Sequence, residues 1–174
     1  VCASASAGPA FEGAECACGM RATDGAIDHI RLSGPDTEAE FSNIGLGKPA
    51  GICGTGYVDL LAEMLRAGII DKIGRLHPAA CRQRCRQRAV GEAEFVVVPA
   101  EDTVHGQDIV ICQSDIQNIL RAKAAIYAAS AVLLHALDLT FDDVAEIMVA
   151  GAFGSFLNTA NAVLIGLLPD LPPS

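Results

Sequence analysis

Three short glycine-rich segments carry the strongest signals for ligand chemistry in this sequence. The most C-terminal one, Gly151-Ala152-Phe153-Gly154-Ser155, follows the apolar run Ile147–Ala150. Glycine lets a backbone approach a ligand without a Cβ clash, and open α/β sheets bind ligands beyond the carboxyl ends of their strands. The Gly-x-x-Gly spacing is equally typical of a plain strand-to-helix turn. On the motif alone we favour that structural interpretation.

The second segment, Gly51-Ile52-Cys53-Gly54-Thr55-Gly56, comes directly before a predicted helix. Free backbone N–H groups at a helix N-terminus favour an anion. The segment lacks the Lys-Ser/Thr ending of a phosphate-binding P-loop, which excludes that motif. A helix start packed closely against a neighbour explains the glycines equally well.

The third segment is Ala7-Gly8-Pro9-Ala10-Phe11-Glu12-Gly13, in which glycine and proline predict a sharp turn. Glu12 could position a ligand hydroxyl or a metal-bound water. A solvated loop carboxylate is the simpler interpretation.

Lys123 is an unusual residue for its position. At helical spacing it falls in the middle of an apolar stripe, between Leu120 and Tyr127. A lysine there either extends its ammonium group to the edge of the core or faces a ligand. The sequence by itself favours the first interpretation.

Seven cysteines, an odd number, occur without a secretory signal pattern, so we expect free thiols of a cytoplasmic protein. Cys16, Cys18, Cys81 and Cys85 do not have a standard metal-ligand spacing, and no metal site is expected. The arginines at positions 82, 84, 86 and 88 favour a solvated loop, with docking to an acidic partner as the alternative.

Composition limits the class of protein. The chain is 51% hydrophobic and 19% charged, enough apolar material for a core. A net charge of −9 argues against nucleic-acid binding, which needs clustered Lys and Arg. Apolar runs stay below the ~18 residues of a membrane span, so no membrane partner is expected.

The elements that must position these residues alternate between strand and helix. Periodicity predicts helices over 55–67, 114–137 and 158–165, the second with a capping box of Ser114 and Gln117. Short apolar runs predict strands over 27–32, 95–98, 109–112 and 147–150, with 41–46 as a partner of the first. Residues 72–94 look polar and irregular. The order at the C-terminal end, helix, strand, glycine loop, helix, indicates an α/β fold.

Six strings in this order resemble the C-terminal ATPase region of the reductive activators of corrinoid proteins, a branch of the actin, heat-shock chaperone and sugar-kinase ATPases. They are residues 2–14, Cys18-Gly19-Met20-Arg21-Ala22, residues 51–56, Leu65-Arg66-Ala67-Gly68-Ile69-Ile70-Asp71, Ala150-Gly151-Ala152-Phe153-Gly154 and Ile165-Gly166-Leu167-Leu168-Pro169-Asp170.

The resemblance implies that residues 1–174 form one incomplete RNase-H-like lobe, a mixed sheet with flanking helices and an irregular insertion at about 72–108. By the same resemblance, Gly151–Ser155 would cradle adenosine, Lys123 would reach the adenine, and Gly8, Pro9, Glu12 and Gly13 would follow the phosphate-binding hairpin. Gly54 and Gly56 would line the floor of the cleft.

Family members use ATP with Mg²⁺ to transfer an electron from an iron–sulfur domain to cob(II)alamin on a corrinoid protein, which restores Co(I) for methyl transfer. This chain lacks the Asp-x-Gly-Thr phosphate signature and the plant-type cluster motif. We therefore expect phosphate binding and the cluster to lie upstream, and this chain alone to hydrolyse ATP weakly or not at all.

Two other functions stay open on the sequence. One is a non-catalytic module that docks a partner or forms a homodimer, with purely structural glycine loops. The other is a small redox or metal module built on Cys16, Cys18, Cys81 and Cys85.

Overall fold

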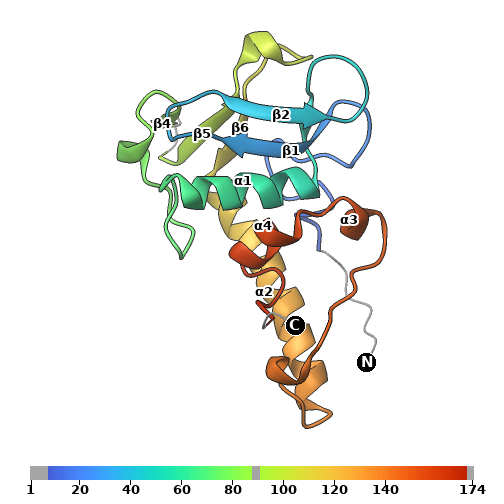
Figure 1. Cartoon of the computed structure of the whole chain (residues 1–174). Helices are drawn as coiled ribbons and strands as arrows, with labels where there is room; N and C mark the ends of the chain where they lie inside the picture. Colours follow the sequence, from blue (N-terminus) through green and yellow to red (C-terminus); the bar gives the residue numbers. More distant parts are fainter. Residues whose placement is uncertain (1–7, 88–90, 172–174) are drawn as a thin grey trace.

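A computed structural model describes residues 8–87 and 91–171, so Cys2 to Ala7 and Arg88 lie outside the described residues. Two three-stranded sheets lie beside the helices (Figure 1). The first has the order β2-β1-β3, from β1 (Ala26–Leu32), β2 (Ala39–Asn43) and β3 (Gly51–Ile52), with β1 antiparallel to β2 and parallel to β3. The second is antiparallel, with the order β4-β5-β6, from β4 (Cys85–Gln87), β5 (Ala93–Val98) and β6 (Ile109–Cys112). The predicted α/β class with a mixed sheet is confirmed.

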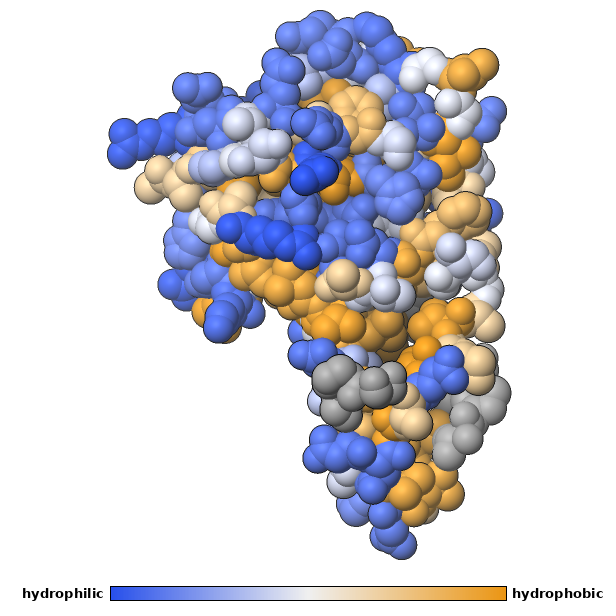
Figure 2. Space-filling model, in the orientation of Figure 1, coloured by the Kyte–Doolittle hydropathy of each residue, from blue (hydrophilic) through white to orange (hydrophobic). Residues whose placement is uncertain are grey.

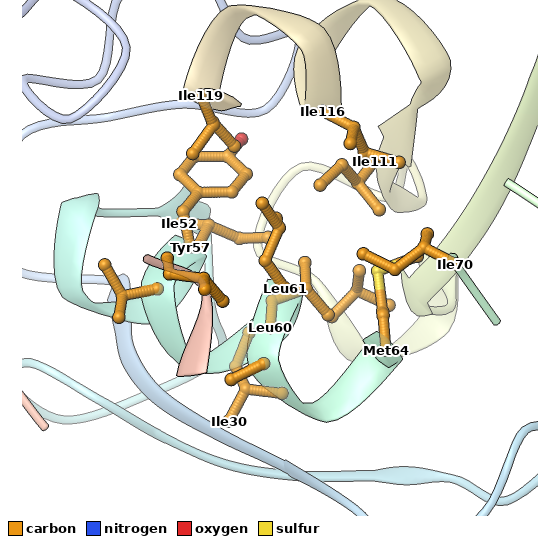
Figure 3. Packing of buried hydrophobic residues seen from close by; sticks show 14 of the residues in the cluster. Ile30, Ile52, Tyr57, Leu60, Leu61, Met64, Ile70, Ile111, Ile116 and Ile119 are labelled. Atoms are coloured by element: carbon orange, nitrogen blue, oxygen red, sulfur yellow. The ribbon is translucent and has the colours of Figure 1, made fainter. Parts of the chain in front are cut away.

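Helix α1 (Gly54–Arg66) is the centre of the core. Most of its side chains are buried, because it packs on β1 and beneath the first turns of α2 (Gln113–His135). Figure 3 shows Tyr57 and Leu61 of α1 on the side of Ile116 and Ile119 of α2, and Leu60 directed toward Ile30 of β1. Gly68, with φ +68°, ends the helix as predicted, since this backbone conformation is strained for other residues.

The two sheets are joined at two places by hydrogen bonds to backbone carbonyls. At one place Arg84 donates from Nε to the Val96 carbonyl, from Nη2 to the Val97 carbonyl and from Nη1 to the Thr37 carbonyl. At the other the Val104 N–H donates to Pro49 O at 3.0 Å. These contacts unite the sheets around one core.

The arginine-rich stretch differs from the prediction. Cys81 and Cys85 form a disulfide, so the expectation of free thiols is wrong for these two. Residues 72–94 are not irregular throughout, because the 3₁₀ turn η1 (Pro78–Ala80) and strand β4 lie within them. Arg86 pairs with Glu94 and Asp108, and Arg84 is half-buried over the Phe95 ring. Arg84 and Arg86 thus have partners within the chain, whereas the sequence predicted a solvated loop or an acidic docking partner for them.

Helix α2 begins at Gln113, one residue before the predicted start. Cys112 is its N-cap, and Asp115 completes the capping box by accepting from the Cys112 N–H at 3.0 Å. The predicted box of Ser114 and Gln117 is wrong, because β6 ends at Cys112 and leads directly into the helix. Among the described residues no helix is long and apolar enough to cross a membrane.

The second half of α2 extends away from the sheets (Figure 1). After it the chain forms the 3₁₀ turn η3 (Phe141–Asp143) and returns in extended form to α3 (Ala152–Ser155) and α4 (Thr159–Leu164). The predicted strand over 147–150 does not form. Ile147, Met148 and Val149 are exposed, since none of the described strands lies beside them to supply hydrogen-bond partners. Figure 2 shows apolar side chains gathered on this lower part of the molecule.

Candidate functional site

The three glycine-rich segments of the sequence meet in the structure. The rings of Phe11 and Phe153 lie with their centroids 5.6 Å apart. A Cβ on Gly54 would come closer than 3.0 Å to the Phe11 carbonyl oxygen and stand 3.0 Å from Cε2 of Phe153. The N-terminal loop, the start of α1 and the α3 turn therefore form one contact region.

The N-terminal loop is a tight turn held by its own backbone. The Ala14 N–H donates to Pro9 O at 2.8 Å, and Gly8 and Gly13 have φ angles of +86° and +83°. Ala10 and Phe11 are buried, whereas Glu12 is exposed. The loop lies against α2, because a Cβ on Gly8 would stand 3.3 Å from Cβ of Ala122. Ala122 is next to Lys123 along the helix.

Gly54 and Gly56 allow neighbouring segments to pack closely against the start of α1. Both residues are buried, and a Cβ on Gly56 would collide with the Ile27 carbonyl oxygen and with Cγ2 of Ile52. The structure thus gives a packing reason for each glycine, which the sequence could not separate from the ligand interpretation. Neither α-carbon faces an open surface.

The α3 turn has one open glycine and one packed glycine. Gly151 has φ +101°, and no atom lies within 4 Å of where its Cβ would be. A Cβ on Gly154 would instead stand 2.7 Å from Cγ1 of Val149. The Ser155 N–H and hydroxyl donate to the Gly151 carbonyl at 3.0 and 3.1 Å, which closes the turn. Ala152 and Ser155 are exposed, so one face of this turn is open to solvent.

Lys123 is half-buried and directed at the end of α4. A Cβ on Gly166, the residue at which the chain leaves α4 with φ +72°, would stand 2.9 Å from Nζ of Lys123. The ammonium group thus lies between α2 and α4, near the carbonyl end of a helix, where a cation is favoured.

A pocket of about 620 Å³ opens beside the N-terminal loop. Its walls are Gly8, Pro9 and Glu15 from the loop and Asn118, Arg121, Ala122 and Ala125 from α2. Asn118 donates to the Glu15 carbonyl at 2.7 Å and accepts from Arg121 Nη1 at 2.9 Å. Two predicted residues, Gly8 and Pro9, line this pocket, whereas Lys123 and Gly151–Ser155 do not.

Sequence reasoning missed Asn118 and Arg121. They are three residues apart on the polar face of α2, and such a pair is ordinarily a solvated one.

The cysteines near the base of α2 are poor nucleophiles. Burial, with the Asp115 carboxylate, raises the pKa of Cys16 to about 12 and raises that of Cys112. These thiols therefore hold their protons at neutral pH, and the thiolate is the reactive and metal-binding form. Within residues 8–87 and 91–171, no group of three or more His, Cys, Asp or Glu could hold a metal ion.

Comparison with known proteins gives one consistent result. The chain is 37% identical over 177 residues to the corrinoid activation enzyme RamQ of Eubacterium limosum, a match that covers 97% of this chain and 29% of RamQ. It is 26% identical over 189 residues to the [Co(II) methylated amine-specific corrinoid protein] reductase of Methanosarcina barkeri, covering 97% of this chain and 31% of the reductase.

A solved structure, the reductive activator for corrinoid, iron-sulfur protein, matches with a TM-score of 0.88 and 44% identity over 95% of this chain. That match covers 26% of the activator, so the chain spans less than a third of the length of each of these relatives. The family described as the C-terminal domain of RACo, the ASKHA domain, matches residues 1–174. This chain therefore belongs to the family of RACo C-terminal ASKHA domains.

Proposed function

We propose that this chain is the adenosine-binding lobe of an ATP-dependent reductive activator, which returns cob(II)alamin on a corrinoid protein to Co(I) for methyl transfer. The observation that carries the proposal is the α3 turn: Gly151 leaves open space where a side chain would stand, in the same region as the Phe11–Phe153 contact. The names of the three relatives give the corrinoid protein as partner.

Gly151 offers adenosine a surface free of Cβ, and Lys123 of α2, whose ammonium group lies near Gly166, supplies a donor. ATP would supply the free energy for an unfavourable electron transfer. Mg²⁺ and the phosphate-binding hairpin would belong to the rest of the ATPase, and an iron–sulfur cluster to a separate N-terminal domain.

The same proposal includes the finer fold. In an RNase-H-like lobe, the apolar run at 147–150 would be a strand that leads into the glycine turn. The run lies between η3 and α3, in a segment without helix or strand, which fits a strand that lacks its neighbours.

Nucleotide titration of the purified chain tests the proposal. Because the phosphate signature is absent, we expect adenosine and ATP to bind with similar affinity. Lys123→Ala should weaken binding by removing a donor, and Gly151→Val should weaken it by filling the open face of the turn.

Each variant has a matched control. Lys72→Ala removes an exposed lysine elsewhere, and Gly47→Val places a side chain at another glycine with positive φ and open surroundings. Binding should be unchanged in both controls. Equal weakening in variants and controls, or no binding by wild-type chain, would overturn the adenosine assignment.

The alternative, a non-catalytic docking or dimerising module, is favoured by the exposed apolar side chains. The large ones on the lower part of the molecule are Tyr127, Val132, Leu137, Leu139, Ile147, Met148, Val149 and Phe156. This alternative expects no nucleotide binding and a molar mass that doubles with concentration, which light scattering measures.

A further inference from the structure

A buried carboxylate on α1 joins three elements behind the α3 turn. Asp59 is 3% exposed and accepts a hydrogen bond from Nδ2 of Asn161 on α4 at 2.6 Å. Its other oxygen accepts from the Ile30 N–H of β1 at 3.4 Å and lies 3.0 Å from Nδ1 of the half-exposed His29. A buried carboxylate needs such partners, and two N–H donors and the His29 imidazole supply them here.

The partner of this carboxylate belongs to a helix that cannot stand alone. Helix α4 has six residues, far below the length at which an isolated helix is stable in water. Asn161 is itself 5% exposed, and Leu157, Ala162 and Ile165 are buried around it. The position of α4 therefore depends on its tertiary contacts, of which the bond to Asp59 is the polar and directional one.

The two ends of α4 lead to the proposed adenosine site. Asn158, its N-cap, accepts from the Asn161 N–H at 3.2 Å and follows the α3 turn by three residues. At the other end Gly166 lies under Nζ of Lys123. A shift of α4 relative to α1 would thus displace both the glycine turn and the lysine.

We propose that Asp59 is a positioning residue, which holds α4 through Asn161 and so sets the distance between Gly151–Ser155 and Lys123. Asp59 does not contact the nucleotide. The inference rests on the proposed function, and it adds a residue that neither the glycine motifs nor the pocket indicates.

A pair of exchanged substitutions tests this role. Asn161→Asp places a second carboxylate against Asp59, and the repulsion should separate α4 from α1. Asp59→Asn combined with Asn161→Asp reverses donor and acceptor, so that an amide on α1 again donates to a carboxylate on α4. Asp102→Asn, an exposed carboxylate-to-amide change on the 3₁₀ turn η2 (Ala100–Asp102), is the matched control.

Adenosine affinity should be measured well below the melting temperature of every variant. We expect Asn161→Asp to raise the dissociation constant about tenfold or more, and the double variant to recover most of that loss. Asp102→Asn should match wild type. A folded Asn161→Asp chain with unchanged affinity would show that Asp59 only stabilises the fold and would overturn the proposal.

Hydrogen exchange keeps the inference separate from the proposed function. If wild-type chain does not bind adenosine, the proposed function fails, and the positioning role is then decided by amide exchange over residues 151–165. Faster exchange there, with strands β4–β6 unchanged, supports the role of Asp59. Unchanged exchange overturns it. If Asn161→Asp does not fold, the single variant Asn161→Ala, which removes the donor to Asp59 without adding a charge, is judged by the same two measurements.

Discussion

At the scale of single residues, the glycines of this chain differ in what surrounds their α-carbons. Gly54 is enclosed by the Phe11 carbonyl and the Phe153 ring, whereas Gly151 faces open space. The sequence shows the same residue type in both turns, and only the surroundings separate packing from an accessible surface. A substitution should therefore affect stability at Gly54 and binding at Gly151.

Gly54→Ala should lower the free energy of unfolding by about 1–3 kcal/mol, because the added methyl group forces apart segments that already touch. Urea unfolding followed by circular dichroism measures the change. Gly34→Ala is the control, since its Cβ would meet the nearest atom, Cγ2 of Thr37, at an ordinary 3.5 Å. Equal stability of the two variants would contradict the packing role of Gly54.

Cys16 provides a prediction about pH. Its pKa is raised to about 12 by burial and by the Asp115 carboxylate, so the thiol should react slowly with iodoacetamide at pH 8. Asp115→Asn removes a negative charge that opposes the thiolate, which lowers the pKa and should accelerate alkylation. Mass spectrometry of the Cys16 peptide measures the rate, and Asp102→Asn should leave that rate unchanged.

The raised pKa of Cys16 also sets how the stability of the folded chain changes with pH. In the unfolded chain Cys16 loses its proton near its ordinary value of 9.0, before the folded chain does. Its contribution to stability is therefore complete below pH 9 and declines as the pH rises from there towards about 12. Rapid alkylation of wild-type Cys16 at pH 8 would contradict both statements.

At the scale of elements, apolar periodicity is sufficient to predict a helix that buries one apolar face in the core. Helix α1 and the first half of α2 follow the predicted pattern, because Tyr57, Leu61 and Ile116 bury one face of each helix. The start of α2 was misplaced by one residue, since a cysteine N-cap has no strong sequence signal. Strand β4 was missed because it contains Arg86 and Gln87, polar residues that pair with β5 at a sheet edge.

The Cys81–Cys85 disulfide could not be predicted from spacing, because a pairing depends on the distance between two α-carbons, here 5.3 Å. The bond closes a short loop that contains Arg84, whose guanidinium joins the two sheets. Replacing both cysteines by serine should lower the free energy of unfolding by about 2 kcal/mol, from the entropy of closing a loop of this length.

Thermal unfolding with and without dithiothreitol measures how much the Cys81–Cys85 disulfide contributes to stability. Wild-type chain in reductant should melt with the double serine variant, and the variant itself should not respond to reductant. A wild-type melting temperature that is the same in both buffers would show that the bond does not contribute. Hydrogen exchange over 78–87 should locate the loss at the joint between the sheets.

At the scale of the whole molecule, the distribution of positive charge differs from its distribution along the sequence. The arginines that form a cluster in the sequence are divided in the structure, since Arg84 contacts backbone carbonyls and Arg86 pairs with two carboxylates. The net charge of −9 thus has little concentrated positive surface to oppose it. Sequence alone indicated the acidic surface, but the use of the arginines depends on contacts between distant segments.

The exposed apolar side chains at 147–149 show why a strand is predicted at 147–150 but does not form. Periodicity identifies a segment suited to a buried strand, yet a strand also needs a neighbour for its N–H and C=O groups. Met148 is 85% exposed and Val132 of α2 is 68% exposed. Because the relatives are more than three times as long as the matched region, we expect the neighbouring strands to come from their remaining sequence.

This expectation can be measured by amide hydrogen exchange over residues 147–150. In the 174-residue chain these amides should exchange within seconds, like those of an unstructured peptide. In a full-length member of the family, the equivalent amides should be protected at least as strongly as those of β5, because a central strand opens only with its sheet. Met148→Asp should leave the stability of the short chain unchanged within about 0.5 kcal/mol, as for a surface substitution, but should destabilise the full-length protein strongly. Fast exchange in both proteins would mean that the apolar run is a docking surface and not a missing strand, and the RNase-H-like lobe would then have to be built without it.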